Sequence, residues 1–284
     1  MTSKYLIGAI KIVIFSIIAI VSSYIFFMLL TSKPLPFSLP IQKEPTIILQ
    51  DIELDDTIQA LDLEWYAGDV IITKSSDNKI HILEKSSTQL DKNKWASVRV
   101  SNDTLYIQSQ NKNNVIIFSF NSPNNRLELQ LPDQVYESFS TYLTSGKLSI
   151  SNFMLDKLYV SMTSGNAHFD EVNAQEIELE MTSGNVNFNG SIEKELKINM
   201  TSGNLDLDTS LNSPDRMFIE MTSGNATVTL SELEGFSVDI DKTSGSFRPD
   251  AELKKLSDKL YQYLDTTNHY SIEMTSGSFD LNIR

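Results

Sequence analysis

Residues 158–207 read LYVSMTSGNAHFDEVNAQEIELEMTSGNVNFNGSIEKELKINMTSGNLDL, and within them the tripeptide Thr-Ser-Gly returns every 19 residues. The full chain of 284 residues contains this tripeptide seven times. Its glycines are Gly146, Gly165, Gly184, Gly203, Gly224, Gly245 and Gly277. The steps between them are 19, 19, 19, 21, 21 and 32 residues. A period near 20 residues indicates that successive repeats stack on one another.

Apolar residues recur at five fixed positions around each glycine, namely −7, −5, −3, +2 and +4. Across the seven repeats, 32 of these 35 positions are apolar, and the exceptions are Thr141, Lys242 and Pro249. The 40% hydrophobic content of the whole chain would fill fewer than half of them. Alternation by two is typical of a strand with one buried face. Because the alternation changes phase between −3 and +2, we expect a bend or bulge at each glycine, where the backbone is least restricted.

Each repeat therefore predicts a strand, a corner, a second strand and a turn. A unit this short cannot bury its own apolar face, so neighbouring units must stack. The same pattern fits around Gly68, with Leu61, Leu63, Trp65, Val70 and Ile72 at the five positions. Other short strands are expected at 80–83, 98–100, 105–107, 115–120 and 127–131. The predicted fold class is all-β, a β-solenoid-like stack of short strands with repeats of about 19–21 residues, and it occupies residues 50–284.

One helix is expected to interrupt the stack at residues 250–264. Four leucines there have helical spacing, and lysines lie on the other faces; the leucines are Leu253, Leu256, Leu260 and Leu264. Pro249 and Asp250 together form a helix start signal. Such an insertion would explain the 32-residue step before the last glycine.

The N-terminal region predicts a membrane anchor. Residues 5–30 are almost continuously apolar, and residues 12–30 contain no charge, which matches the roughly 20 residues that span a bilayer. Lysines near the start favour a cytoplasmic tail at residues 1–4. The alternative is a cleaved signal peptide with Val21 and Ser23 at the cleavage site, but the apolar run continues to Leu30.

Residues 31–49 contain four prolines and predict an extended stalk. Together with the anchor, the stalk predicts a single-pass protein of the cell membrane whose C-terminal β-domain is extracytoplasmic.

The composition excludes several classes of function. From residue 34 onward there are 37 acidic and 20 basic residues, and such a surface repels the phosphates of nucleic acids. The chain has no cysteine, which excludes disulfides, thiol nucleophiles and a lipidated cysteine. The three histidines have no metal-site spacing, and the repeated serines would each need a base of their own to be nucleophiles. No catalytic, cofactor or metal residue is predicted.

Two rows of outward positions are the candidate binding face. Carboxylates occupy position −4 in Glu180, Glu220, Asp241 and Glu273, and position +3 in Asp206 and Asp280. If the repeats stack in register, these residues form two polar rows. One interpretation is a solvated surface that prevents aggregation between sheet edges. The other is a site for divalent cations or a cationic partner.

The corners and the apolar register around them resemble a known family. The matching residues are Gly68-Asp69-Val70, Ser164-Gly165-Asn166, Ser183-Gly184-Asn185, Ser202-Gly203-Asn204 and Ser223-Gly224-Asn225. From about residue 50 to the end, the chain is similar to the "putative adhesin" domain family of bacterial envelope proteins, the LiaG-like group among them. The resemblance implies a β-solenoid-like fold, an envelope location, and links to adhesion or envelope stress. It supplies no catalytic residue, and the insertion at 250–264 departs from the family pattern.

These observations predict a non-enzymatic, membrane-anchored β-repeat module that binds or scaffolds at the cell envelope, without a cofactor. Its partner would be an envelope polymer or a surface protein. The alternative is an accessory regulator of an envelope-stress signalling system. A carbohydrate-active enzyme is disfavoured, although a single carboxylate pair could be hidden among so many acidic residues.

Overall fold

The computed structural model describes residues 43–110, 123–233, 235–264 and 268–284. The expected membrane segment at 5–30, the tail at 1–4, most of the stalk and the expected strand at 115–120 lie outside these residues. Within the described ranges, no helix has both the length and the apolar character needed to cross a membrane.

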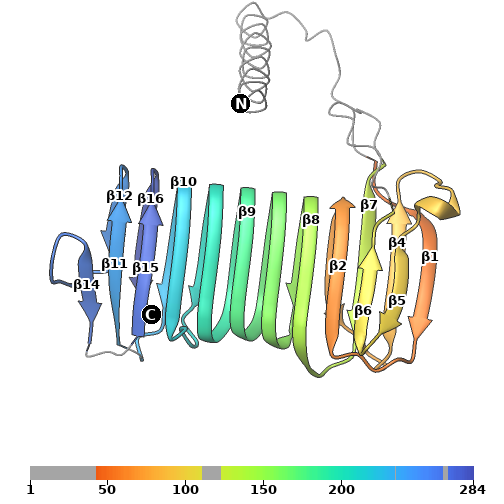
Figure 1. Ribbon diagram of the computed structural model, residues 1–284, viewed down its shortest axis with the longest axis horizontal. Helices are drawn as coiled ribbons and strands as arrows, with labels where there is room; N and C mark the ends of the chain where they lie inside the picture. The colour runs from red at the N-terminus through yellow and green to blue at the C-terminus, as the bar shows by residue number, and fades with distance from the viewer. Residues whose placement is uncertain (1–42, 111–122, 234, 265–267) are drawn as a thin grey trace, which may run out of the picture. The chain divides into compact units, whose positions relative to one another are not determined.

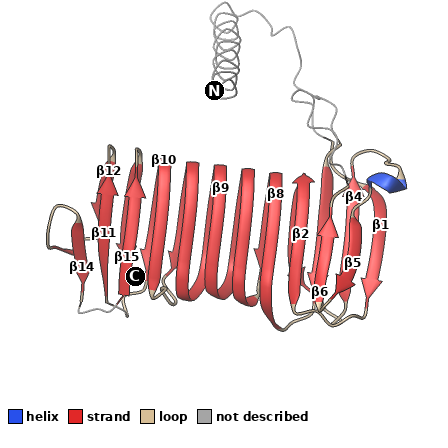
Figure 2. Cartoon of the chain, in the orientation of Figure 1, coloured by secondary structure: helices blue, strands red, loops and turns tan. Residues whose placement is uncertain are grey.

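Strands dominate the described residues, as expected, and the one helical turn among them is Lys92–Lys94 (Figure 2). In chain order the strands are β1 Ile47–Leu54, β2 Ala60–Ala67, β3 Asp69–Lys74, β4 Ile80–Ser86, β5 Ser97–Ser101, β6 Thr104–Gln108, β7 Asn125–Leu131, β8 Val135–Ser151, β9 Met154–Thr209, β10 Arg216–Leu230, β11 Phe236–Lys242, β12 Ser246–Pro249, β13 Lys254–Lys255, β14 Leu260–Tyr263, β15 Asn268–Met274 and β16 Ser278–Ile283. The first strand begins at Ile47, inside the stretch expected to be stalk.

The repeats stack as parallel coils whose corners lie side by side. In the β8–β9 ladder Gly146 lies opposite Gly165, and in the β9–β10 ladder Gly203 lies opposite Gly224. The strands therefore form one row (Figure 1). We call residues −7 to −2 before each corner glycine limb A, and residues +1 to +5 after it limb B.

The core follows the register expected from the sequence. Of the 35 positions in the seven repeats, 32 are buried, and all five positions around Gly68 are buried too. Lys242 and Pro249 are exposed and Phe247 is half-buried, because their coil lies near one end of the row. Thr141 is buried although polar, and its Oγ1 donates to the Tyr159 carbonyl oxygen at 3.4 Å.

The coils do not stack in the order of the chain. The C-terminal strand β15 pairs with β10 on one side and with β11 on the other, all in parallel. In limb B, β16 pairs with β10 and β12. The repeat around Gly277 is therefore an interior coil, placed between those of Gly224 and Gly245. At the ends of the row, antiparallel pairs close the parallel stack: β1 with β4, β5 with β6, and β13 with β14.

The expected helix at 250–264 is wrong, because this segment forms β13 and β14 instead. A turn between them is closed by Ser257, whose Oγ accepts from the backbone N–H groups of Lys259 and Leu260 at 3.3 and 3.1 Å. Ser residues favour such local turns over helix interiors.

The leucine spacing in this segment does not reflect a buried helical face. Leu256 is 45% exposed and Leu264 is 57% exposed. The side chains that pack are instead two tyrosines with strand alternation. Tyr261 lies 5.1 Å from the ring of Phe247, and Tyr263 lies 5.7 Å from the ring of Phe236. The segment therefore covers the end of the stack as a hairpin.

The corner of each coil depends on a glycine. Gly184 has φ of +139°, and a Cβ added to it would overlap the carbonyl oxygen of Gly165 in the adjacent coil. The same holds at every other Thr-Ser-Gly corner, and also at Gly68, whose neighbour is Asn125. The corners thus form a column of backbone groups packed too closely for any side chain.

Asparagines next to the glycines join neighbouring corners. The Asn185 amide donates to the Asn166 side-chain oxygen at 2.8 Å, and the Asn204 amide donates to that of Asn185 at 2.8 Å. Asn225 continues this ladder to Asn204 at 3.2 Å. At the Gly277 corner, Ser278 occupies the asparagine position, and its Oγ donates to the Asn225 side-chain oxygen at 2.7 Å. Both kinds of bond hold one corner to the next, as in stacked asparagine ladders.

We expect Gly184→Ala to unfold the stack at lower denaturant than the wild type. Alanine would have to adopt a left-handed backbone conformation, which costs about 1–2 kcal/mol. Its methyl group would also overpack the corner, which costs about 1–3 kcal/mol. Urea unfolding measures the loss, expected to exceed about 2 kcal/mol. Ser183→Ala is the matched control, since Ser183 is exposed at the same corner. Equal stability of the two variants would show that the corners do not pack as described.

Candidate functional site

The outward side of limb A is the candidate binding face. Its side chains at positions −6, −4 and −2 form rows across the coils, because every second side chain of a strand points to the same face. We call this surface the limb A face. It runs from β6 through β2, β8, β9, β10 and β15 to β11. Among the described residues, four hollows open on this face. They are spread across the row of strands, from β6 at one end to β11 at the other.

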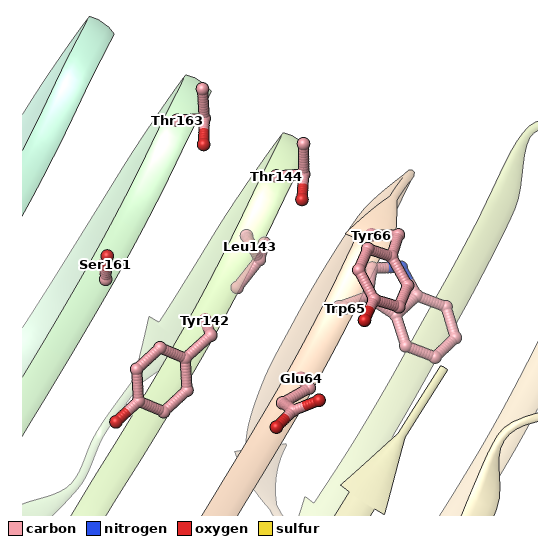
Figure 3. Close-up of a pocket in the computed structure, with 8 residues that line it drawn as sticks. All are labelled: Glu64, Trp65, Tyr66, Tyr142, Leu143, Thr144, Ser161 and Thr163. Atoms are coloured by element: carbon pink, nitrogen blue, oxygen red, sulfur yellow. The ribbon is translucent and has the colours of Figure 1, made fainter. Parts of the chain in front are cut away.

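The largest hollow has a volume of about 280 Å³ and is lined by aromatic and hydroxyl groups (Figure 3). We call it the aromatic hollow, and its outward residues are Glu64, Tyr66, Tyr142, Thr144, Ser161 and Thr163. Glu64 on β2 lies directly opposite Tyr142 on β8 in the parallel ladder. The Tyr142 side chain is 44% exposed, and its ring lies 5.3 Å from that of Tyr159. The hollow therefore offers an aromatic surface beside a carboxylate.

A second hollow of about 180 Å³ adjoins Glu64 on the side of β6. Gln108 Nε2 donates to Glu64 Oε2 at 2.5 Å, which orients the carboxylate. The guanidinium of Arg99 lies 3.7 Å from the ring centre of Tyr106. Partial burial and the nearby charge of Glu64 raise the pKa of Asp62, while the charge of Arg99 opposes this shift.

The opposite end of the limb A face is acidic. Glu220, Glu273 and Asp241 lie side by side on β10, β15 and β11, around a hollow of about 180 Å³. Lys259 Nζ lies 2.8 Å from Asp241 Oδ1 and balances part of this charge. Among the described residues no group of three or more His, Cys, Asp or Glu side chains could hold a metal ion.

The other predicted residues do not join these three. Glu180 is on limb A, but Asn199 separates its coil from Glu220, and its carboxylate accepts from the Tyr159 hydroxyl at 3.1 Å. Asp206 and Asp280 are on limb B, with Thr227 between them in the ladders.

Both limb B carboxylates have partners. Asp206 accepts from the Asn187 amide at 3.3 Å. Asp280 forms an ion pair with Arg248, in which Arg248 Nη2 donates to Asp280 Oδ2 at 2.9 Å. These two carboxylates of the +3 row are thus engaged by neighbouring side chains. Cation binding by the acidic end of limb A stays a prediction.

Sequence reasoning missed the aromatic hollow. The available signal was the presence of large aromatic residues at outward positions, where the other repeats have small or polar residues. Tyr66 stands where other coils have threonine, and Tyr142 stands at position −4. Their combination with Glu64 is a property of the β2–β8 ladder, which joins distant parts of the chain.

We expect Asp62→Asn to change how stability depends on pH. Because the pKa of Asp62 is raised in the folded state, the unfolded chain releases this proton first, and the folded state loses stability as pH rises through the folded pKa. The advantage of Asp62→Asn over the wild type should therefore grow as pH rises above 3.8, the ordinary pKa of an aspartate, and level off once Asp62 is ionised in the folded state. Urea unfolding at several pH values measures it. Asp51→Asn, which removes an exposed charge on β1, is the control, and a pH-independent difference for Asp62→Asn would contradict the assignment.

Comparison with solved structures finds proteins of low sequence identity to this chain. Similar solved structures include a "putative cell adhesion protein" from Clostridium sporogenes, 15% identical, covering 83% of this chain and 99% of that chain with a TM-score of 0.40. A "putative adhesin" from Bacteroides fragilis is 14% identical, with coverages of 85% and 100% and a TM-score of 0.38. A "putative lipid binding protein" from Parabacteroides distasonis is 13% identical, with coverages of 86% and 99% and a TM-score of 0.40. Similarity at this level carries no functional inference.

No curated protein matches the chain. A family model described as Toastrack DUF4097 matches residues 58–246, which is more than half of the 284 residues. The matched range includes β2 to β11 and so covers most of the limb A face. This chain therefore belongs to the Toastrack DUF4097 family.

Proposed function

We propose that this protein is a non-enzymatic binding module that holds a linear polymer of the cell envelope along its limb A face. The observation that carries the proposal is the placement of four hollows on this one face, in line with the stack. A polymer lying across the strands would meet them one after another. Several weak subsites in line then add up to firm retention.

The dimensions of the face suit an extended chain. Glu64 and Asp241 lie on the first and the last of eight neighbouring strand segments. Three of these segments belong to β9. With strands about 4.7–4.9 Å apart, the row is about 33 Å long. Backbone ladders hold every coil to the next, so the spacings between the subsites are fixed. No flexible linker between subsites has to be ordered when a ligand binds. Such preorganisation favours binding of a repetitive ligand.

The proposed setting is the outer side of the cell membrane. The expected anchor at 5–30 and the stalk at 31–49 motivate this part of the proposal. An anchor with a stiff spacer would hold the limb A face within reach of envelope polymers. The accessory-regulator alternative shares this setting but needs no polymer.

Topology is tested by labelling single cysteines on intact cells with a membrane-impermeant maleimide. The chain has no native cysteine, and Lys254 is exposed on β13. We expect Lys254→Cys to react without permeabilisation, because the β-domain would lie outside. Lys4→Cys, in the expected cytoplasmic tail, should react only after permeabilisation. The reverse pattern would place the β-domain inside and end the envelope proposal.

Polymer binding is tested by co-sedimentation of the full-length chain, in detergent, with insoluble envelope polymer. The polymer is prepared from the cells that naturally make this protein. Ser161→Arg places a large charged side chain in the aromatic hollow, and we expect retention to fall by roughly tenfold, or about 1.4 kcal/mol. Ser149→Arg makes the same change on the outward side of limb B and should bind like the wild type. Equal binding by all three proteins would contradict the proposal. Shortening of the polymer during the assay would indicate an enzyme instead.

A further inference from the structure

We infer that the aromatic hollow is a subsite for one pyranose ring of an uncharged polysaccharide. The inference rests on the proposed function and names the class of polymer that the limb A face would hold. It is carried by the chemistry and the geometry of Glu64, Tyr142 and the hydroxyl groups around them (Figure 3).

Tyr142 supplies the apolar surface of the subsite. A pyranose ring has one face of C–H groups, and it is bound through that face by an exposed aromatic ring, which is apolar on its faces and rigid. Tyr142 is 44% exposed on a continuous strand. Its tilted contact with Tyr159 supports the ring from the neighbouring coil, and the Tyr159 hydroxyl is in turn held by Glu180. The platform is thus ordered before any ligand arrives.

Polar groups that could meet the hydroxyls of a sugar line the same hollow as Tyr142. Glu64 lies directly across the ladder from Tyr142, and a carboxylate can accept several hydrogen bonds at its two oxygens. Gln108 fixes its orientation. Thr144, Ser161 and Thr163 line the same hollow, and hydroxyl groups both donate and accept. Such a mixture of aromatic and few polar groups is typical of small-molecule sites.

The size of the hollow suits a single ring. Its volume of about 280 Å³ is just below the ~300–1,000 Å³ of pockets for drug-sized ligands. The hollow opens onto the limb A face, so neighbouring units of a polymer could continue across the strands in either direction. A closed pocket would admit only a chain end.

The charge around the hollow disfavours an anionic sugar. Glu64 lines the hollow, Asp62 lines the adjoining hollow, and the chain carries a formal net charge of −14. Uronic acids or phosphate-containing polymers would meet repulsion locally and from the whole molecule. The guanidinium of Arg99, which lines the adjoining hollow, is stacked on Tyr106.

The test is isothermal titration calorimetry of the full-length chain in a detergent without sugar head groups. The probes are cellohexaose and chitohexaose, both uncharged, and the anionic hexamer of galacturonic acid. We expect binding of at least one uncharged hexamer and none of the anionic one. Tyr142→Ala should weaken binding at least tenfold, and Tyr142→Phe should retain it because the ring is kept. The control is Leu211→Ala, which removes a 75% exposed side chain in the turn after β9, away from the four hollows, and it should change affinity less than twofold. Phe218→Ala removes a 40% exposed aromatic ring in another hollow of the limb A face.

The outcomes separate this inference from the proposed function. Loss of binding with Phe218→Ala but not with Tyr142→Ala would place the sugar elsewhere on the face and overturn the inference alone. The inference alone also fails if the anionic hexamer binds best, or if the envelope polymer is retained while no hexamer binds. Absence of binding to both the hexamers and the envelope polymer would overturn both proposals. Thermal unfolding of each variant should match the wild type, since Tyr142 and Phe218 are exposed.

Discussion

The packing of one corner glycine against the next is the constraint on which the rest of this structure depends. At each Thr-Ser-Gly corner the backbone has positive φ, and the space of a Cβ is occupied by the carbonyl oxygen of the adjacent coil. This contact sets where one coil lies relative to the next. The ladders on both limbs then follow in register, and the apolar side chains of all coils meet in one continuous core.

The same register determines the surface. Once the corners are aligned, every outward position forms a row across the coils, so the character of a row depends on which side chains the repeats supply. On limb B they include an asparagine ladder and the ion pair between Arg248 and Asp280. On limb A they include exposed aromatic rings at one end and three adjacent carboxylates at the other. A regular scaffold therefore presents an irregular face, and that irregularity is what a ligand could recognise.

The ends of the stack differ from its middle in how their strands pair. A parallel stack leaves unpaired backbone groups at both ends, which invite association with other chains. Antiparallel pairs close the row at each end, and the C-terminal strand is enclosed as an interior coil rather than left at an edge. Lysines on β13 add charge to the last short strand.

The sequence by itself determined the all-β class, the corners and the buried positions of the repeats, because alternation by two and a fixed spacing around glycine are local properties of strands. It could not determine the order of the coils. Similar repeats present equivalent edges, and only the assembled stack decides that β15 pairs between β10 and β11. Tertiary packing also decided the structure of residues 250–264. Their leucine spacing predicted a helix, but tyrosines on a hairpin contact the core instead. The aromatic hollow joins Glu64 to Tyr142 across a ladder between distant segments, and such a pairing exists only once the chain has folded.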